Sequence, residues 1–190
     1  MNYNPVKIEP IYTFYQNYGF GLSLQKLADT VQLTKKTLFN RYSSKENLEL
    51  CVIDHWQLKS NERMMQRMEF TNNAVEKLLI FLFELQYCKK NEPHLFQKSK
   101  EIFIEKFIQN SPNITQLEKI FKMGEKEKLF WFDSEMKVYA YFFLFNALFL
   151  LLSSNLIYTE FIPFLFEPIL TEEGKTVFKD IDIEQIFMSN

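Results

Sequence analysis

Basic side chains gather within residues 23–45 of this sequence, a stretch that contains a single acid, Asp29. The basic residues of the stretch are Lys26, Lys35, Lys36, Arg41 and Lys45. The whole chain of 190 residues has a formal net charge of −2, so this cluster is a basic island on a weakly acidic protein. An island of this kind attracts a polyanion such as the phosphate backbone of a nucleic acid.

Two short helices are predicted to present the basic island, and a third begins directly after it. Apolar residues recur at the spacing of one helical face, at Leu24, Leu27, Ala28 and Val31. Three residues stand where a side-chain oxygen can cap a helix N-terminus: Ser23, Thr34 and Ser44. This geometry suits insertion of the middle helix into a major groove about 12 Å wide. A solvated helical hairpin with ordinary surface lysines is the alternative interpretation.

The order of residues in this region resembles the DNA-binding region of the TetR family of bacterial repressors. In that family Phe-x-x-x-Gly ends the first helix, and the recognition helix reads roughly Ser-x-Gly-Thr-Leu-Tyr-x-x-Phe, followed by Ser-Lys-Glu-x-Leu. The matching residues here are Tyr15, Gly19, Ser23, Leu27-Ala28, Thr34, Thr37-Leu38-Phe39, Tyr42 and Ser44-Lys45-Glu46 with Leu48. The resemblance covers about residues 8–54.

The resemblance implies an all-α fold with two domains. Residues 1–48 would form a three-helix helix-turn-helix DNA-binding domain, and residues 49–190 a helical effector-binding and dimerisation domain. It further implies a transcriptional regulator, most simply a repressor, that binds a double-stranded DNA operator as a homodimer. A small-molecule effector would change the spacing of the two DNA-binding domains. It would act through its different affinity for the DNA-competent and the DNA-incompetent state.

The basic island supplies the candidate DNA contacts, which are Ser23, Thr34, Lys35, Lys36, Thr37, Asn40, Arg41 and Lys45. Lys35, Lys36 and Asn40 are candidates for base edges, because lysine can donate to guanine and asparagine can pair with adenine. For the two lysines, contact with phosphate alone remains open. Thr34, Thr37 and Arg41 suit phosphates. Lys45 would combine its charge with the free N–H groups of a helix N-terminus.

Three departures from the family pattern affect this region. Lys36 replaces a small residue early in the recognition helix and adds positive charge to the surface predicted to contact DNA. Gln32 stands where the family usually has Gly, and a left-handed conformation there costs a residue other than glycine about 1 kcal/mol. We therefore expect an adjusted turn. Phe39 replaces a Tyr whose hydroxyl often meets a phosphate in the family, so that hydrogen bond is lost here.

The first helix is limited by Pro10, which stands where the family has Ala. Proline is tolerated in the first turn of a helix but not in its interior. We therefore expect this helix to begin near Glu9 or Pro10 and to end at Tyr18, before Gly19.

The rest of the chain differs in composition, because 18 of its 21 Phe residues lie after residue 50. Periodicity predicts helices over 44–68 and 74–90, another opened by Pro93 and continuing through Phe107, and another that starts at Pro112 and stops at Gly124. Asp133 is a candidate N-cap for a later helix. Pro163 and Pro168 should break the chain into short pieces, and Gly174 suggests a loop.

A stretch without charge runs from Val138 to Thr159, and its 22 residues are long enough for a transmembrane span. Four polar residues inside it and the lack of an adjacent basic cluster argue against that interpretation. The polar residues are Asn146, Ser153, Ser154 and Asn155. The resemblance implies instead a dimerisation helix that borders the effector cavity, so no membrane partner is expected.

Five aromatic residues and one amide of this second part are candidates for the effector pocket: Phe103, Phe107, Trp131, Tyr141, Phe145 and Asn146. Such a lining would suit an apolar or aromatic effector. Ordinary core packing is the alternative for each of them.

Other chemistry is sparse in this sequence. Cys51 and His55 lie four residues apart, on one helical face, but two ligands do not complete a zinc site. No phosphate-binding glycine loop, serine nucleophile motif or metalloprotease motif occurs, so we expect no enzyme, catalytic residue, metal or cofactor. Two cysteines without a signal peptide favour the cytoplasm. The alternative function is a membrane-attached or protein-binding helical module without sequence-specific DNA binding.

Overall fold

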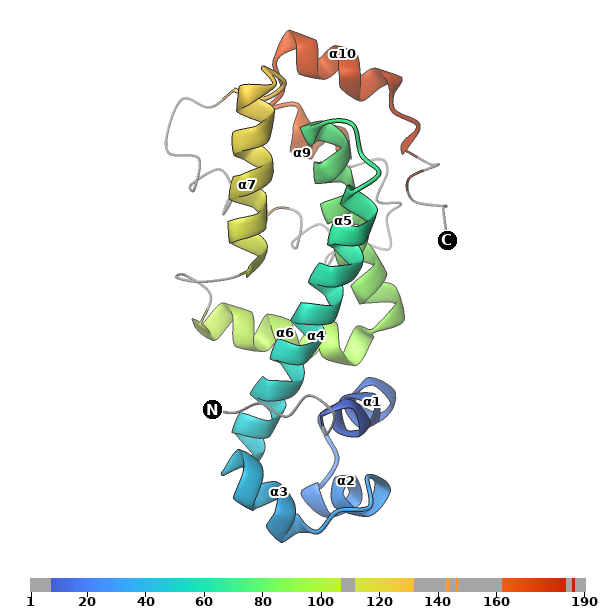
Figure 1. Ribbon diagram of the computed structural model, residues 1–190, viewed down its shortest axis with the longest axis vertical. Helices are drawn as coiled ribbons and strands as arrows, with labels where there is room; N and C mark the ends of the chain where they lie inside the picture. Colours follow the sequence, from blue (N-terminus) through green and yellow to red (C-terminus); the bar gives the residue numbers. More distant parts are fainter. Residues whose placement is uncertain are drawn as a thin grey trace. The chain divides into compact units, whose positions relative to one another are not determined.

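The computed structural model describes residues 8–106, 112–131, 143, 146, 162–183 and 186, and their regular structure is helical (Figure 1). Within these residues the single extended pairing is an isolated antiparallel bridge between Phe130 and Leu170. The predicted all-α fold is confirmed. The chain divides into a first unit, Met1–Glu62 with Cys88–Phe107, and a second unit, Arg63–Tyr87 with Ile108–Asn190.

The first unit contains α1 (Glu9–Tyr18), α2 (Leu24–Thr30), α3 (Lys35–Tyr42), the first part of α4 (Lys45–Met68) and α6 (Pro93–Lys106). The three predicted N-caps are confirmed. The backbone N–H of Lys26 donates to Ser23 Oγ at 3.2 Å, that of Thr37 to Thr34 Oγ1 at 3.1 Å, and that of Asn47 to Ser44 Oγ at 3.0 Å. These local bonds set where each helix begins.

A small aromatic and aliphatic core holds the helices of the first unit together. Ile11, Leu27, Leu38 and Leu48 are each at most 2 % exposed, so every one of the first four helices contributes to the core. Helix α1 packs against both α2 and α6, and α2 packs against α3 (Figure 1). The predicted start and end of the first helix are confirmed, because α1 runs from Glu9 to Tyr18.

The turn between α2 and α3 keeps the left-handed conformation that a glycine usually adopts. Gln32 has φ +54° there, so the expected adjustment of the turn does not occur. Instead the chain accepts the steric cost of a side chain in this region.

Replacing Gln32 by glycine should therefore raise the free energy of unfolding by about 0.5–1 kcal/mol, because glycine adopts this conformation without a Cβ clash. The control is Gln25→Gly, in which a glycine inside α2 should lower stability by a similar amount. Urea unfolding measures both. A loss of stability in Gln32→Gly would show that the turn is not strained.

The second unit contains the end of α4, most of α5 (Ala74–Asn91), α7 (Pro112–Lys126), α9 (Ile162–Phe166) and α10 (Glu172–Asp180). Phenylalanine rings form its core in successive edge-to-face pairs. Ring centroids are 5.8 Å apart for Phe121 and Phe143 and 6.1 Å for Phe143 and Phe166, in favourable edge-to-face geometry. Part of the phenylalanine enrichment is therefore core packing.

Two glycines lie within helices, contrary to the prediction that they mark a helix end and a loop. Helix α7 continues past Gly124 to Lys126, and Gly174 lies in the first turn of α10. A Cβ on Gly124 would stand 2.0 Å from the Phe130 ring, and one on Gly174 would stand 2.1 Å from the Leu129 carbonyl oxygen. Both glycines permit close approach rather than a change of chain direction.

The uncharged stretch from Val138 to Thr159 lies outside the described residues apart from Phe143 and Asn146, and so does Asp133. Among the residues that the structure does describe, no helix is both long and apolar enough to span a bilayer. Pro163 lies in α9, a helix of only five residues, as the predicted break of the chain into short pieces requires.

Candidate nucleic-acid interface

Helix α3 has one buried anchor and an otherwise polar, exposed surface. Leu38 is 2 % exposed and fixes the helix to the core of the first unit. The exposed residues at its start and along its length are Thr34, Lys35, Lys36, Thr37, Phe39, Asn40 and Arg41. Lys36 and Asn40 lie four residues apart, on the face opposite Leu38. Within the first unit, the surface predicted to contact DNA is therefore accessible.

Two of the three candidate hydroxyls, those of Ser23 and Thr34, already accept a hydrogen bond from the backbone. Thr34 Oγ1 caps α3, and it also lies 2.9 Å from Thr37 Oγ1 in a second hydrogen bond. Ser23 Oγ caps α2 in the same way. A hydroxyl oxygen that accepts in a cap still carries a hydrogen that it can donate. Ser23 and one of the two threonines can thus donate to a phosphate without uncapping a helix.

The acid of the basic island is turned toward its own helix. Asp29 Oδ1 accepts a hydrogen bond from Gln25 Nε2 at 2.6 Å, one helical turn earlier. Lys26, Lys35 and Lys36 are all exposed, so the positive charges of α2 and α3 face solvent. The local potential remains attractive to a polyanion.

Lys45 binds groups of its own protein, an arrangement that the sequence did not predict. Its Nζ donates to the carbonyl oxygens of Leu22 at 3.2 Å and Phe20 at 3.4 Å. Its charge is paired with Glu49 at 3.5 Å, and Glu49 also binds Lys98 Nζ at 2.9 Å. Lys45 therefore fixes the loop before α2. The acid four residues after Lys45 was the sequence signal for part of this arrangement.

Two tyrosines of the first unit remain protonated at neutral pH. Burial raises the pKa of Tyr42, and the adjacent Arg41 guanidinium opposes this increase only in part. Burial, followed by the negative charge of Glu49, raises the pKa of Tyr15 well above its ordinary value. Both phenols therefore keep their O–H groups as hydrogen-bond donors.

A buried carboxyl group joins three helices of the first unit. Glu92, directly before α6, is 5 % exposed. It accepts hydrogen bonds from the Trp56 indole of α4 at 2.7 Å and from the Tyr12 hydroxyl of α1 at 3.1 Å. These bonds connect α6 with the helices that flank α2 and α3, and sequence periodicity carried no signal for them.

Cys51 and His55, whose spacing alone would suit two metal ligands, are in surroundings that do not favour metal binding. His55 Nε2 lies 2.8 Å from Glu9 Oε2, in contact with α1. Burial, followed by the charge of Asp54, raises the pKa of the Cys51 thiol, which disfavours the thiolate that binds a metal. No cluster of three or more His, Cys, Asp or Glu residues that could hold a metal ion occurs in the described part of the chain.

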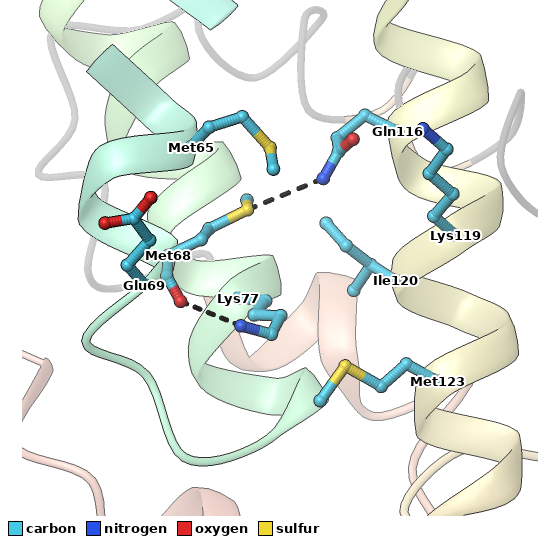
Figure 2. Close-up of a pocket in the computed structure, with 8 residues that line it drawn as sticks. All are labelled: Met65, Met68, Glu69, Lys77, Gln116, Lys119, Ile120 and Met123. Atoms are coloured by element: carbon cyan, nitrogen blue, oxygen red, sulfur yellow. Dashed lines mark hydrogen bonds between the residues drawn. The ribbon is translucent and has the colours of Figure 1, made fainter. Parts of the chain in front are cut away.

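The second unit contains a cavity of about 290 Å³ between the end of α4, the start of α5 and α7 (Figure 2). It is lined by Met65, Met68, Glu69, Lys77, Gln116, Lys119, Ile120 and Met123. Figure 2 shows the Gln116 amide directed across the cavity to the Met68 sulfur, with Nε2 and Sδ 3.6 Å apart. The Lys77 ammonium is held by the Met68 carbonyl oxygen at 2.8 Å.

The predicted pocket residues are not among those that line this cavity. Trp131 is 48 % exposed, and Asn146 is half-buried elsewhere in the second unit. Phe107, Tyr141, Phe145 and the side chain of Phe103 lie outside what the structure describes. The aromatic residues of the sequence did not predict this cavity, because flexible methionines also line adaptable apolar sites.

Solved structures of regulators share this architecture. A gamma-butyrolactone receptor, an ArpA-like protein, superposes with a TM-score of 0.66 at 10% identity, over 96% of this chain and 94% of that one. A TetR-family regulator from Agrobacterium tumefaciens gives 0.59 at 11% identity, over 86% and 95%. AibR in complex with isovaleryl coenzyme A and operator DNA gives 0.57 at 18% identity, over 84% and 95%.

No protein-family model matches the sequence, and no curated protein matches it at a significant level. The structural likeness nevertheless extends over most of the chain and includes the helix-turn-helix that residues 8–54 predicted. The chain therefore has the fold of the TetR family of transcriptional regulators.

Proposed function

We propose that this protein is a transcriptional regulator that binds operator DNA as a homodimer through α3 and responds to a small effector. The observation that carries the proposal is the exposed cationic surface of α3, anchored from behind by Leu38. A capped short helix of this kind fits the major groove, and its lysines can meet base edges or phosphates. The known complex of AibR with operator DNA supports the same use of the fold.

The proposed DNA contacts are Ser23, Thr34, Lys35, Lys36, Thr37, Asn40, Arg41 and Lys45. For Lys45 the side chain already has protein partners, so its proposed contribution is its positive charge together with the N-terminus of α4. The proposed functional domains are residues 1–48 for DNA and 49–190 for the effector and the dimer. The protein is proposed to be a repressor and not an enzyme. It would act in the cytoplasm.

The effector is proposed to be small and apolar or aromatic. The residues predicted from the sequence remain candidates for its pocket, and the cavity between α4, α5 and α7 is a second candidate region. The lining of this cavity contains three methionines and Ile120, which together offer an adaptable apolar surface. A ligand there would act only through unequal affinity for the DNA-competent and incompetent states.

The test is selection of bound duplexes from a random library by the full chain, followed by affinity measurements over a range of salt concentrations. Arg41→Ala should weaken binding to all sequences and reduce the log–log salt slope by about two per dimer, because each protomer loses one phosphate contact. The control is Lys179→Ala, an exposed lysine on α10, which should bind as the parent does.

Failure to enrich any duplex would exclude the proposed function and favour a protein-binding module. An Arg41→Ala variant with unchanged affinity and salt slope would show that α3 does not lie along the DNA as proposed. Light scattering on the same samples, with and without duplex, measures whether the protein binds as a dimer.

A further inference from the structure

Phe39 is an exposed aromatic side chain on an otherwise polar helix surface. Its side chain is 49 % exposed, although it lies beside the buried Leu38. It follows Lys35 by four residues and Lys36 by three, so the three side chains share neighbouring positions on α3. An apolar ring therefore lies within the surface that the proposed function assigns to DNA.

Folding of the first unit does not account for this position. Leu38 already anchors α3 to the core with 2 % exposure, and half-buried Tyr42 extends the same apolar face by one turn. The exposed part of the Phe39 ring instead remains available to an apolar group of a partner. The positive charges of Lys35 and Lys36, within one helical turn of it, select a partner that is also anionic.

The major groove of DNA contains one such apolar group next to phosphates. Among the four bases, only thymine presents a methyl group, at C5, to the major groove, and apolar side chains read it by contact. The phenylalanine ring has no hydrogen-bond donor for a phosphate or a base edge. Its chemistry thus restricts it to apolar contact.

We infer that Phe39 is a specificity-determining residue that reads a thymine through its C5 methyl group. This inference rests on the proposed function, because it requires α3 to enter the major groove. It assigns to Phe39 a base preference, whereas packing of the ring against the sugar–phosphate backbone would strengthen binding equally at all sequences.

The experiment uses the full chain and a duplex selected from a random library. Each thymine of the bound site is replaced in turn by deoxyuridine, which removes the C5 methyl group and leaves every hydrogen-bonding group in place. At one position in each half-site, the parent protein should lose about fourfold in affinity. This is the factor expected when the burial of one methyl group is lost.

Phe39→Ala should bind the selected duplex more weakly and should no longer distinguish thymine from deoxyuridine at that position. Phe39→Leu should retain part of the discrimination, because leucine also offers an apolar surface. The control is Tyr18→Ala, which removes a ring that is 55 % exposed on α1 and should keep the full fourfold effect. Far-ultraviolet circular dichroism verifies that each variant is folded.

The outcomes separate this inference from the proposed function. If no duplex is enriched, the proposed function fails and the inference fails with it. If a duplex is enriched but no deoxyuridine substitution changes the affinity of the parent, the inference alone is overturned. Equal sensitivity to deoxyuridine in the parent and in Phe39→Ala also overturns it, because another residue would then contact the methyl group.

Discussion

Replacing Glu92 by leucine is expected to lower the free energy of unfolding by about 3 kcal/mol. The substitution removes the acceptors of the Trp56 indole N–H and the Tyr12 hydroxyl, which lie 2.7 and 3.1 Å from the carboxyl oxygens. A buried donor left without a partner costs roughly 1–3 kcal/mol, and leucine offers neither donor an alternative. Urea unfolding of the full chain measures the loss.

Two further variants identify the cause. Glu92→Gln keeps one acceptor oxygen and should lose about half as much stability. Glu101→Gln, on an exposed part of α6, should change the unfolding free energy by less than about 0.5 kcal/mol. If Glu92→Leu were as stable as Glu101→Gln, the carboxyl group would not hold α1, α4 and α6 together.

Replacing Gly19 by alanine is the second change for which we expect a large effect, a loss of about 2–3 kcal/mol in unfolding free energy. Gly19 has φ +70° and ψ −172°, a backbone conformation that is essentially restricted to glycine. A Cβ at this position would also stand 3.0 Å from Nδ1 of His94. The strain acts where α1 ends and the chain turns toward α2.

The matched control is Gly21→Ala, two residues later, where a Cβ would have no atom within 4 Å. That variant should be neutral or slightly more stable, since alanine restricts the unfolded chain. Combining Gly19→Ala with His94→Ala separates the strain of the backbone conformation from the contact between the new Cβ and His94. If the contact matters, Gly19→Ala should cost less in the His94→Ala background. A neutral Gly19→Ala variant would refute the strained conformation.

Local chemistry made the N-terminal helices predictable from sequence. Ser23, Thr34 and Ser44 cap the helices that follow them, because a cap depends on residues within one turn. Gly19 ends α1 for a similarly local reason. The helix-turn-helix could therefore be assigned without knowledge of the rest of the fold.

Tertiary contacts were not predictable in the same way. The partners of Lys45 include two carbonyl oxygens more than twenty residues earlier, and no local pattern announces them. The predictions for Gly124 and Gly174 were wrong because glycine serves both turns and close packing. The cavity near Met68 was missed because its lining comes from three separate helices. These features arise only when distant segments meet.

The first unit is assembled from two separated lengths of chain, Met1–Glu62 and Cys88–Phe107. Helix α6 belongs to the later length, and it brings buried Leu95 and Phe96 to the core. During synthesis, the ribosome therefore releases the complete helix-turn-helix before the segment that closes its core. The side chains of Trp56 and Tyr12 therefore remain exposed to water until more than half of the polypeptide has been translated.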